Sequence, residues 1–389
     1  DTASTKFYTL SLHDALPISR AKRFDENNNE KLHDTVAAFI NWRMFEIPGV
    51  NIEDITIPIR TFKSGTLPTK DDIDEMLNDI RDNINKLEKT IQSELFDIIK
   101  QELDNFTLNP SEEAEYLKEP NLKESSGTHF YILPSDKIIL EDLNIGDNVG
   151  DTKVSKLKKH LLGFTNTMTP DYEIPKIKAS FREHNKTDDL QIDIIEEDEF
   201  FTPDDFINSD HRFKGEFDQY GQFHGEITIY GQEPVKYHLP WKGNGGKETS
   251  CGSFKLDFAA IQGQVSESSL PPEVQRRMYA KTFKIGGLYI YKNGIRVLPY
   301  GDNDFDFLDI EKRRAMNAGT AYFSYRRMFG TIEIDNQENK ELKEKAGREG
   351  FQENKAYRQF RDILMHFLDK VAEDFIRDKG IYSDIFLQT

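Results

Sequence analysis

One arginine of this chain stands between two glycines, immediately before the last long helical pattern, in residues 347–350. A guanidinium donates two parallel hydrogen bonds to phosphate oxygens and keeps its charge at any working pH. Flanking glycines allow close approach to a ligand, and the N–H groups at the start of the next helix favour an anion. Arg348 is therefore a candidate phosphate-binding and catalytic residue; the alternative is a solvated arginine beside a helix cap.

Two polar residues follow Arg348 closely, and each has two possible roles. Gln352 and Asn354 either contact the same ligand or cap the helix that starts after them. Capping is the favoured role of Asn354, because asparagine is among the preferred N-cap residues. Gln352 is kept as a candidate cofactor-binding residue.

A β-hairpin and a long helix are predicted to position this loop. Residues 288–291 and 295–298 are β-branched and aromatic runs joined by Asn293-Gly294, which tolerates positive φ at both turn positions. The helix is predicted because apolar residues recur at spacings that place them on one face. These residues are Ala356, Phe360, Ile363, Leu364, Phe367, Leu368, Val371 and Phe375.

The composition indicates folded domains. A length of 389 residues predicts about two or three of them, and 28 Phe provide apolar side chains for their cores. The net charge of -18 argues against a surface that coats nucleic acid, although a local basic patch is compatible with it. A single cysteine, Cys251, excludes an internal disulfide and fits a reducing compartment, so a cytoplasmic location is expected. No apolar run approaches the roughly 18 residues of a membrane span, so no membrane association is expected.

Residues 1–19 differ from the rest of the chain. They show no charged face and no helical period, and FYTLSLHDALPIS resembles a translated sequencing adapter. We interpret them as a non-native segment and leave them out of the fold prediction. A secretory segment is the alternative, but His13 and Asp14 lie in its middle and no basic stretch precedes it. The natural protein is therefore expected to begin upstream.

Residues 20–165 are predicted as a mainly helical region. Helical spacing predicts one helix at residues 30–45 and a second after Thr69, which forms a capping box with Asp72. The second helix carries a heptad-like apolar seam, which either binds a partner or packs within its own chain. Residues 103–126 are polar and predict a linker, and residues 163–170 predict a hinge into a second domain, 166–389.

The second domain alternates strand-like runs with turns. Several strands are predicted between residues 177 and 258, including a hairpin around Tyr220-Gly221, and a helix follows Pro271-Pro272. Further strands and the long final helix come after it. This order predicts an α+β fold in which helices pack on one face of a sheet.

The C-terminal features occur in an order that resembles the GHKL-type ATP-binding proteins, which include gyrase B, MutL, MORC proteins, histidine kinases and a heat-shock chaperone. The basic cluster EKRR at residues 311–314 and the strand pattern at 326–335 precede NKELKEKAGREGFQENKAYRQF. The resemblance covers residues 127–378 and is closest to the MORC-like and chaperone-like branch. REGFQENKAYRQF is similar to the chaperone's middle-domain segment in which an arginine on a mobile loop reaches the γ-phosphate of ATP.

This resemblance implies a remnant of an ATP-binding α/β sandwich, followed by a ribosomal-S5-like transducer or middle domain. Arg348 matches the γ-phosphate arginine. Gly127 and Thr128, which precede a β-run, match a Gly-Thr pair near the nucleotide phosphates; an ordinary turn is the alternative for this pair. The intact parent would use ATP and Mg²⁺, form a homodimer through its nucleotide domains and transmit their closure to an unknown protein partner or client.

The family's ATP-holding motifs are missing from this sequence. It contains no DxGxG, no asparagine helix with a general-base glutamate and no glycine-rich lid. We therefore expect a truncated ATPase whose nucleotide lobe lies upstream, and which neither binds nor hydrolyses ATP appreciably alone.

Other sites are excluded or secondary. Residues 241–249 do not fit a P-loop, residues 302–313 do not fit a calcium loop, and the histidines and Cys251 form no zinc motif, so no metal site is expected. The secondary phosphate candidates, each with a surface ion pair as the alternative, are Lys292, Arg296, Arg313 and Arg314.

Two other functional classes are open. One is a non-catalytic interaction module that binds a protein, and no nucleotide, through the helix after Thr69 and the acidic sheet. The other is a MORC-like or MutL-like DNA-associated ATPase, which salt-dependent DNA retention would test. It would use a basic patch gathered from Lys156, Lys158, Lys159, Arg276, Arg277, Arg326 and Arg327.

Overall fold

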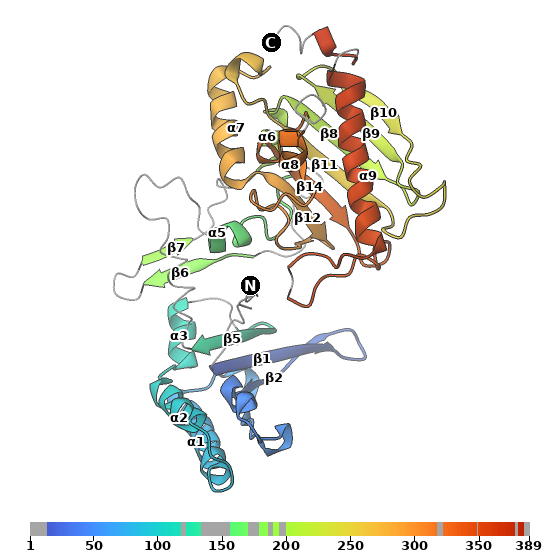
Figure 1. Ribbon diagram of the computed structural model, residues 1–389. Helices are drawn as coiled ribbons and strands as arrows, with labels where there is room; N and C mark the ends of the chain where they lie inside the picture. Colours follow the sequence, from blue (N-terminus) through green and yellow to red (C-terminus); the bar gives the residue numbers. More distant parts are fainter. Residues whose placement is uncertain are drawn as a thin grey trace. The chain divides into compact units, whose positions relative to one another are not determined.

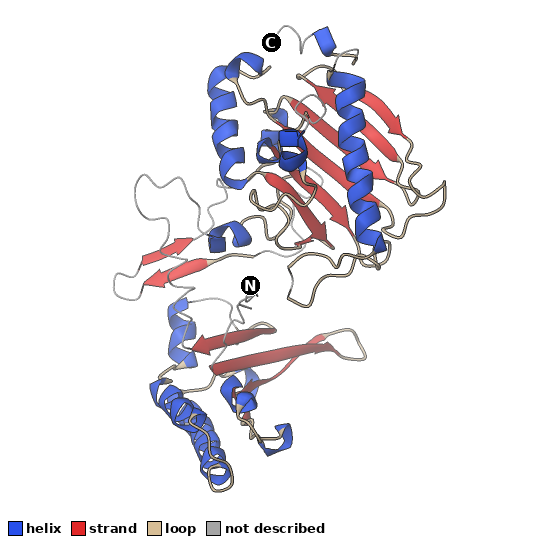
Figure 2. Ribbon diagram, in the orientation of Figure 1, coloured by secondary structure: helices blue, strands red, loops and turns tan. Residues whose placement is uncertain are grey.

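The chain is represented by a computed structural model (Figure 1). It describes residues 14–117, 122–133, 156–169, 179–185, 190–193, 200–316, 322–347, 349–377 and 380–384. The chain divides into two compact units, Asp1–Glu141 and Asp142–Thr389. Both units combine strands with helices (Figure 2), so the predicted α+β class is confirmed.

The first unit is built on a sheet in the order β3-β1-β2-β4, and β5 pairs with β1. Its strands are β1 (Asp14–Phe24), β2 (Glu30–Ala38), β3 (Ile40–Asn41), β4 (Ile59–Phe62) and β5 (Gly127–Leu133). Residues 14–19, which belong to the segment interpreted as non-native, form the start of β1. Leu16 and Ile18 of this strand are fully buried.

The prediction of a helix at residues 30–45 is wrong. This segment contains β2 and β3, and then the 3₁₀ turn η1 (Trp42–Glu46). Leu32 and Val36 are four residues apart, and an even spacing fits the alternation of a strand as well as a helical turn. Antiparallel pairing of β2 with β1 on one side and β4 on the other explains the strand.

The second helix of this region is confirmed as α1 (Lys70–Leu87). Its predicted capping box is present, because Thr69 N donates to Asp72 Oδ2 at 2.8 Å and Asp72 N donates to Thr69 Oγ1 at 3.4 Å. Ile73, Leu77 and Ile84 of its seam are buried in the core of their own unit. Packing within the chain is therefore the observed role of the seam.

The prediction of a linker at residues 103–126 is also wrong for much of this segment. Helix α2 (Leu95–Asn105) extends into this segment, and α3 (Pro110–Leu117) lies inside it. Glutamates made the segment look like a polar linker, but glutamate has a high helix propensity and α2 buries Phe96, Ile99 and Leu103. Two short 3₁₀ turns complete the unit, η2 (Ile52–Asp54) and η3 (Lys63–Gly65).

The second unit is built on a seven-stranded sheet in the order β10-β9-β8-β11-β14-β12-β13. Its strands are β8 (His211–Phe217), β9 (Phe223–Ile229), β10 (Val235–Leu239), β11 (Phe254–Ala260), β12 (Gly287–Lys292), β13 (Ile295–Arg296) and β14 (Met328–Ile334). Only β12 and β14 pair in parallel within this sheet. A separate two-stranded sheet contains β6 (Arg182–Asn185) and β7 (Leu190–Asp193).

The helical elements of this unit, in chain order, are α5 (Lys156–Leu161), α6 (Pro203–Ile207), η6 (Val265–Glu267), α7 (Pro272–Ile285), α8 (Ile310–Met316), η7 (Tyr325–Arg327), α9 (Lys355–Val371) and the π-helical turn η8 (Ala372–Ile376). The predicted hairpins are confirmed. Asn293 and Gly294 have φ of 53° and 86°, and β8 turns into β9 around Gly221 at φ 79°.

Helices cover both faces of the large sheet, so the prediction of one covered face is wrong. Leu288 and Ile290 of β12 join the core that contains α9, whereas Tyr289 and Tyr291 join a second core with Met278 of α7. Figure 1 shows α7 and α9 over different parts of the sheet. A strand that is apolar at every position needs cover on both faces, and GLYIY is such a run.

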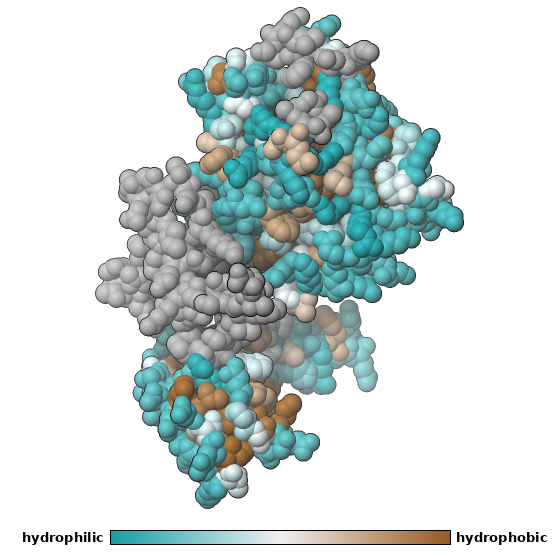
Figure 3. Space-filling model, in the orientation of Figure 1, coloured by the Kyte–Doolittle hydropathy of each residue, from teal (hydrophilic) through white to brown (hydrophobic). Residues whose placement is uncertain are grey.

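None of the described helices combines the length and hydropathy that crossing a bilayer requires. The face of the second unit visible in Figure 3 is mostly hydrophilic. The strongly acidic composition accounts for such a surface, because charged side chains stay in water.

Candidate functional site

The loop that contains Arg348 closes on itself at its base. Arg348 lies outside the described residues. On either side of it, Lys345 N donates a hydrogen bond to Gly350 O at 2.8 Å. Glu344 and Phe351 form an antiparallel bridge one step further out. The four residues 346–349 therefore connect two hydrogen-bonded arms.

Both arms of the loop are anchored to the core of the second unit. Phe351 is buried, its N–H donates to the Tyr300 hydroxyl at 3.1 Å, and the two rings stack with centroids 5.3 Å apart. On the other arm Leu342 is fully buried, and its carbonyl accepts from Lys292 Nζ at 3.3 Å. The base of the loop is thus fixed on both sides.

Gln352 and Asn354 lie on this base and at the start of α9. Gln352 N donates to Lys343 O at 2.8 Å, and its side-chain Nε2 donates to Glu344 O at 3.3 Å. Asn354 Oδ1 accepts from Tyr357 N at 2.9 Å, so its predicted role as the helix cap is confirmed. A nucleotide contact by Gln352 stays a prediction.

Gly127 and Thr128 open strand β5 in the first unit. Gly127 pairs with Arg20 and Thr128 with Ser19 of β1. The Thr128 hydroxyl lies 2.9 Å from the Ser19 hydroxyl. The structure therefore brings Gln352 to the loop of Arg348 but places the Gly-Thr pair in the other unit.

All four secondary phosphate candidates have protein partners. Lys292 Nζ lies 3.5 Å from a carboxylate oxygen of Glu344, in addition to its bond with the Leu342 carbonyl. Arg313 forms an ion pair with Asp369 of α9 at 2.5 Å. Ion pairing, the alternative named for these two residues, is what the structure contains.

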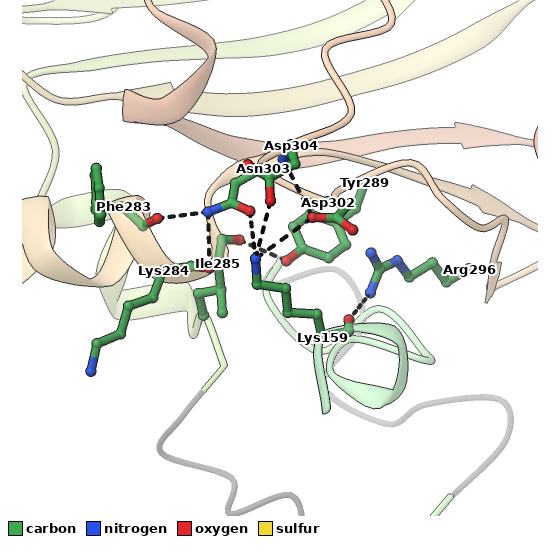
Figure 4. A network of polar contacts seen from close by, with 9 residues as sticks. All are labelled: Lys159, Phe283, Lys284, Ile285, Tyr289, Arg296, Asp302, Asn303 and Asp304. Carbon is green, nitrogen blue, oxygen red and sulfur yellow. Dashed lines mark hydrogen bonds and ion pairs between the residues drawn. The ribbon is translucent and has the colours of Figure 1, made fainter. Parts of the chain in front are cut away.

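Arg296 is not available to a phosphate, because it is buried and bonded to backbone carbonyls. Its Nε donates to Tyr300 O at 2.8 Å, and its Nη1 donates to Lys159 O at 2.6 Å and Leu162 O at 2.7 Å. The guanidinium carbon also lies 4.5 Å from the ring centroid of Tyr289 (Figure 4). Arg296 thus holds α5 and the residues after it against the β12–β13 hairpin, and the predicted hinge lies inside the second unit.

Arg314, the fourth candidate, lines a pocket of 680 Å³ together with Arg326 and Arg327. Helices α7 and α8, the turns η6 and η7, and the segment after β11 form the walls. We call this the arginine pocket. Its lining residues are Tyr230, Gln262, Gly263, Gln264, Glu267, Tyr279, Phe283, Glu311, Arg314, Tyr322, Ser324, Arg326 and Arg327.

A buried polar network supports the wall of the arginine pocket. Gln262 Nε2 donates to the Tyr230 hydroxyl at 2.9 Å and also to the Tyr322 hydroxyl. Beside it, His211 Nδ1 accepts from Tyr230 N at 3.3 Å, which leaves the ring proton on Nε2. That Nε2 donates to the Tyr322 hydroxyl at 3.0 Å. His211 therefore orients two residues that line the pocket.

His211 is neutral in this network. Its pKa is lowered to about 4, mainly by burial; the carboxylate of Asp210 opposes this effect, and the charge of Arg327 adds to it. The unfolded chain binds a proton at His211 near pH 6.5, whereas the folded chain does so only near pH 4. Folding stability contributed by neutral His211 is therefore complete above pH 6.5 and decreases as the pH falls towards 4.

We expect the free energy of unfolding of the second unit to decrease by about 3 kcal/mol between pH 7 and pH 4 through His211. The variant His211→Gln keeps one donor and one acceptor but cannot take up a proton, so it should lose this part of the pH dependence. Urea denaturation at several pH values measures both proteins. If the free energy of unfolding changed with pH by the same amount in the two proteins, the expected titration of His211 would be contradicted.

The sequence identified the arginines of this pocket only as positively charged residues and did not indicate that they line one pocket. Arg326 and Arg327 were assigned to a basic patch with Lys159, but Lys159 Nζ donates to Asn303 Oδ1 at 2.8 Å and faces Asp302 and Asp304 (Figure 4). The adjacent pairs at 313–314 and 326–327 are the only signal of the pocket in the sequence. They do not reveal which segments meet, because those contacts are long-range.

The chain matches no protein-family model and no curated protein. The function is therefore argued from the resemblance of its motifs and from the geometry described above.

Proposed function

We propose that this chain is the transducer part of a GHKL-type ATPase, in which Arg348 reaches the γ-phosphate of ATP held by a separate nucleotide-binding lobe. The observation that carries the proposal is the closed base of the loop, with Lys345 N bonded to Gly350 O at 2.8 Å. A short tip on an anchored base suits a residue that must meet a phosphate in one geometry. The finer fold assignment, a ribosomal-S5-like domain after a remnant of the ATP-binding domain, belongs to the same proposal.

In this proposal Arg348 stabilises the negative charge that develops on the γ-phosphate during transfer to water. Gln352 holds the two arms of the loop together, as its bond to the Glu344 carbonyl suggests. Gly127 and Thr128 contribute to the phosphate side of the nucleotide lobe, which also holds Mg²⁺. The protein acts in the cytoplasm as a homodimer and passes closure of the lobes to a partner protein.

ATP turnover tests the proposal. The chain alone is expected to release no phosphate from ATP, because the sequence contains neither the general-base helix nor the DxGxG motif. Joined to a nucleotide-binding lobe of this family, it should gain turnover that depends on Arg348. Phosphate release by the chain alone, retained after purification to homogeneity, would contradict the assignment.

The two glycines that flank Arg348 are expected to differ in their tolerance of alanine. Gly350 has φ +89°, and a Cβ there would lie 3.1 Å from the Tyr300 hydroxyl, so Gly350→Ala should cost about 1–2 kcal/mol. Gly347 has no positive φ, and a Cβ there would meet only Glu349 at 3.8 Å, so Gly347→Ala should change the stability by less than about 0.5 kcal/mol. Thermal unfolding of the two variants measures the contrast, and equal losses would exclude a fixed loop base.

The interaction-module alternative named two binding surfaces, the helix after Thr69, which is α1, and the acidic sheet. Ile73, Leu77 and Ile80 of the apolar seam of α1 are each 1% exposed, so they offer no surface to a partner. No other described feature of α1 replaces the seam, because the helix surface that stays exposed is polar.

A further inference from the structure

The arginine pocket contains more positive charge than its own side chains neutralise. In the described part of the chain, no carboxylate oxygen forms an ion pair with the side chain of Arg326 or Arg327. Arg314 reaches Glu311 at only 3.9 Å. Three guanidinium groups therefore line one cavity with no close carboxylate on two of them.

The surroundings of the Arg327 side chain disfavour its positive charge. Burial lowers its pKa, and the neighbouring charge of Arg314 lowers it further. An anion between the two guanidinium groups would offset both effects. Gly263 leaves room for this arrangement, because a Cβ at that position would lie 2.5 Å from Arg327 Nη1.

Two aromatic rings on α7 line the same cavity. Tyr279 and Phe283 are 38% and 52% exposed, respectively, so both rings are accessible to a ligand. They are four residues apart, so they lie on one face of the helix. Exposed rings beside arginines provide a stacking surface next to a phosphate site.

Two carboxylates also line the pocket. Glu311 is occupied, because it accepts from the Ser324 hydroxyl at 2.6 Å and from Arg326 N at 3.5 Å. Glu267 has no ion pair with any described residue, so it offers an acceptor to a ligand hydroxyl or amino group. The pocket thus combines phosphate donors, a stacking surface and one free acceptor.

We propose that the arginine pocket binds a phosphorylated small molecule with a planar ring, of the class of nucleoside monophosphates. The volume of 680 Å³ lies within the range of small-molecule sites, about 300–1,000 Å³. Arg314 and Arg327 hold the phosphate, Tyr279 or Phe283 stacks on the base, and Glu267 accepts from the sugar or base. None of the described residues that line this pocket belongs to the loop of Arg348.

Calorimetric titration of the full chain with AMP tests this site, with adenosine and inorganic phosphate as separate probes. AMP should bind with a Kd of about 10 µM to 1 mM, and each of the other two at least about 10-fold more weakly. No heat from AMP up to about 10 mM would overturn the proposal. Equal affinity for AMP and phosphate would overturn the stacking part, and tighter binding of a short single-stranded oligonucleotide than of AMP would overturn the assignment to a free small molecule.

Adjacent residues of α8 provide the matched control. Arg314→Ala should weaken AMP binding at least about 10-fold, because it removes a charged donor. Arg313→Ala should leave the affinity unchanged, since Arg313 pairs with Asp369 instead. Equal effects of the two variants would overturn the proposal.

A second variant changes the geometry without removing a charge. Gly263→Ala pushes the end of the Arg327 side chain aside, so it should weaken AMP binding while circular dichroism stays unchanged. Unchanged AMP affinity in this variant would overturn the role of Arg327. Arg348→Ala should leave AMP binding intact, so failure of this site and failure of the proposed ATPase are distinguishable.

Discussion

Replacing Arg348 with alanine is expected to lower ATP turnover by about 10³-fold or more, once the chain is joined to a nucleotide-binding lobe of the GHKL type. The effect should fall on kcat rather than on KM for ATP, because the arginine acts on charge that develops in the transition state. Steady-state phosphate release at several ATP concentrations separates the two parameters.

The lysine variant tests the chemistry of the same position. Arg348→Lys keeps the charge but loses the planar fork of donors, so its turnover should fall between those of wild type and Arg348→Ala. Arg358 is the matched control, since it is an exposed arginine near the start of α9 whose Nη1 donates to the Glu353 carbonyl at 2.9 Å. Wild-type turnover in Arg348→Ala, or an equal loss in Arg358→Ala, would refute the role of Arg348.

Features of the fold with a local cause were predictable from the sequence. The capping box at Thr69 and Asp72 fixes the start of α1 by bonds between residues three apart. Asn293-Gly294 determines a tight turn by its own backbone preferences. The apolar stripe follows from helical periodicity alone: seven of its eight residues lie in α9, Phe375 lies in the following turn η8, and all eight are buried.

Features that depend on distant partners were not predictable in the same way. Residues 30–38 form β2 because β1 and β4 flank them, although their apolar spacing also fits a helix. The position of α7 on the opposite face from α9 follows from the side chains of β12, which enter one core on one face and a second core on the other. A single sequence indicates such a strand but not which helix covers each face.

The same distinction separates the two candidate sites: the residues of one are neighbours in the sequence, and those of the other are not. The loop of Arg348 is visible in the sequence because its glycines, arginine and helix cap are neighbours along the chain. The arginine pocket draws on residues from 230 to 327, and the sequence shows only their types. Positions such as Gly263, where the absence of a Cβ leaves room for Arg327, acquire a meaning only in three dimensions.

The second large effect is expected in the aromatic core beneath α9. Phe367 is fully buried, and its ring centroid lies 4.5 Å from that of Phe223 and 5.5 Å from that of Phe217. Phe367→Ala should reduce the free energy of unfolding by about 3–5 kcal/mol, because it removes a buried ring and leaves a cavity among rings that cannot close it. Urea denaturation and hydrogen exchange of the α9 amides measure the loss.

Phe283 of α7 supplies the control for this substitution. It is 52% exposed, so Phe283→Ala removes the same atoms from a helix of the same unit with a much smaller loss of burial than Phe367→Ala. Its effect should stay within about 0.5 kcal/mol. Helix propensity changes equally in both variants, so the difference between them isolates the packing of α9 on β8 and β9. Equal losses in the two variants would contradict the packing of Phe367 between Phe217 and Phe223.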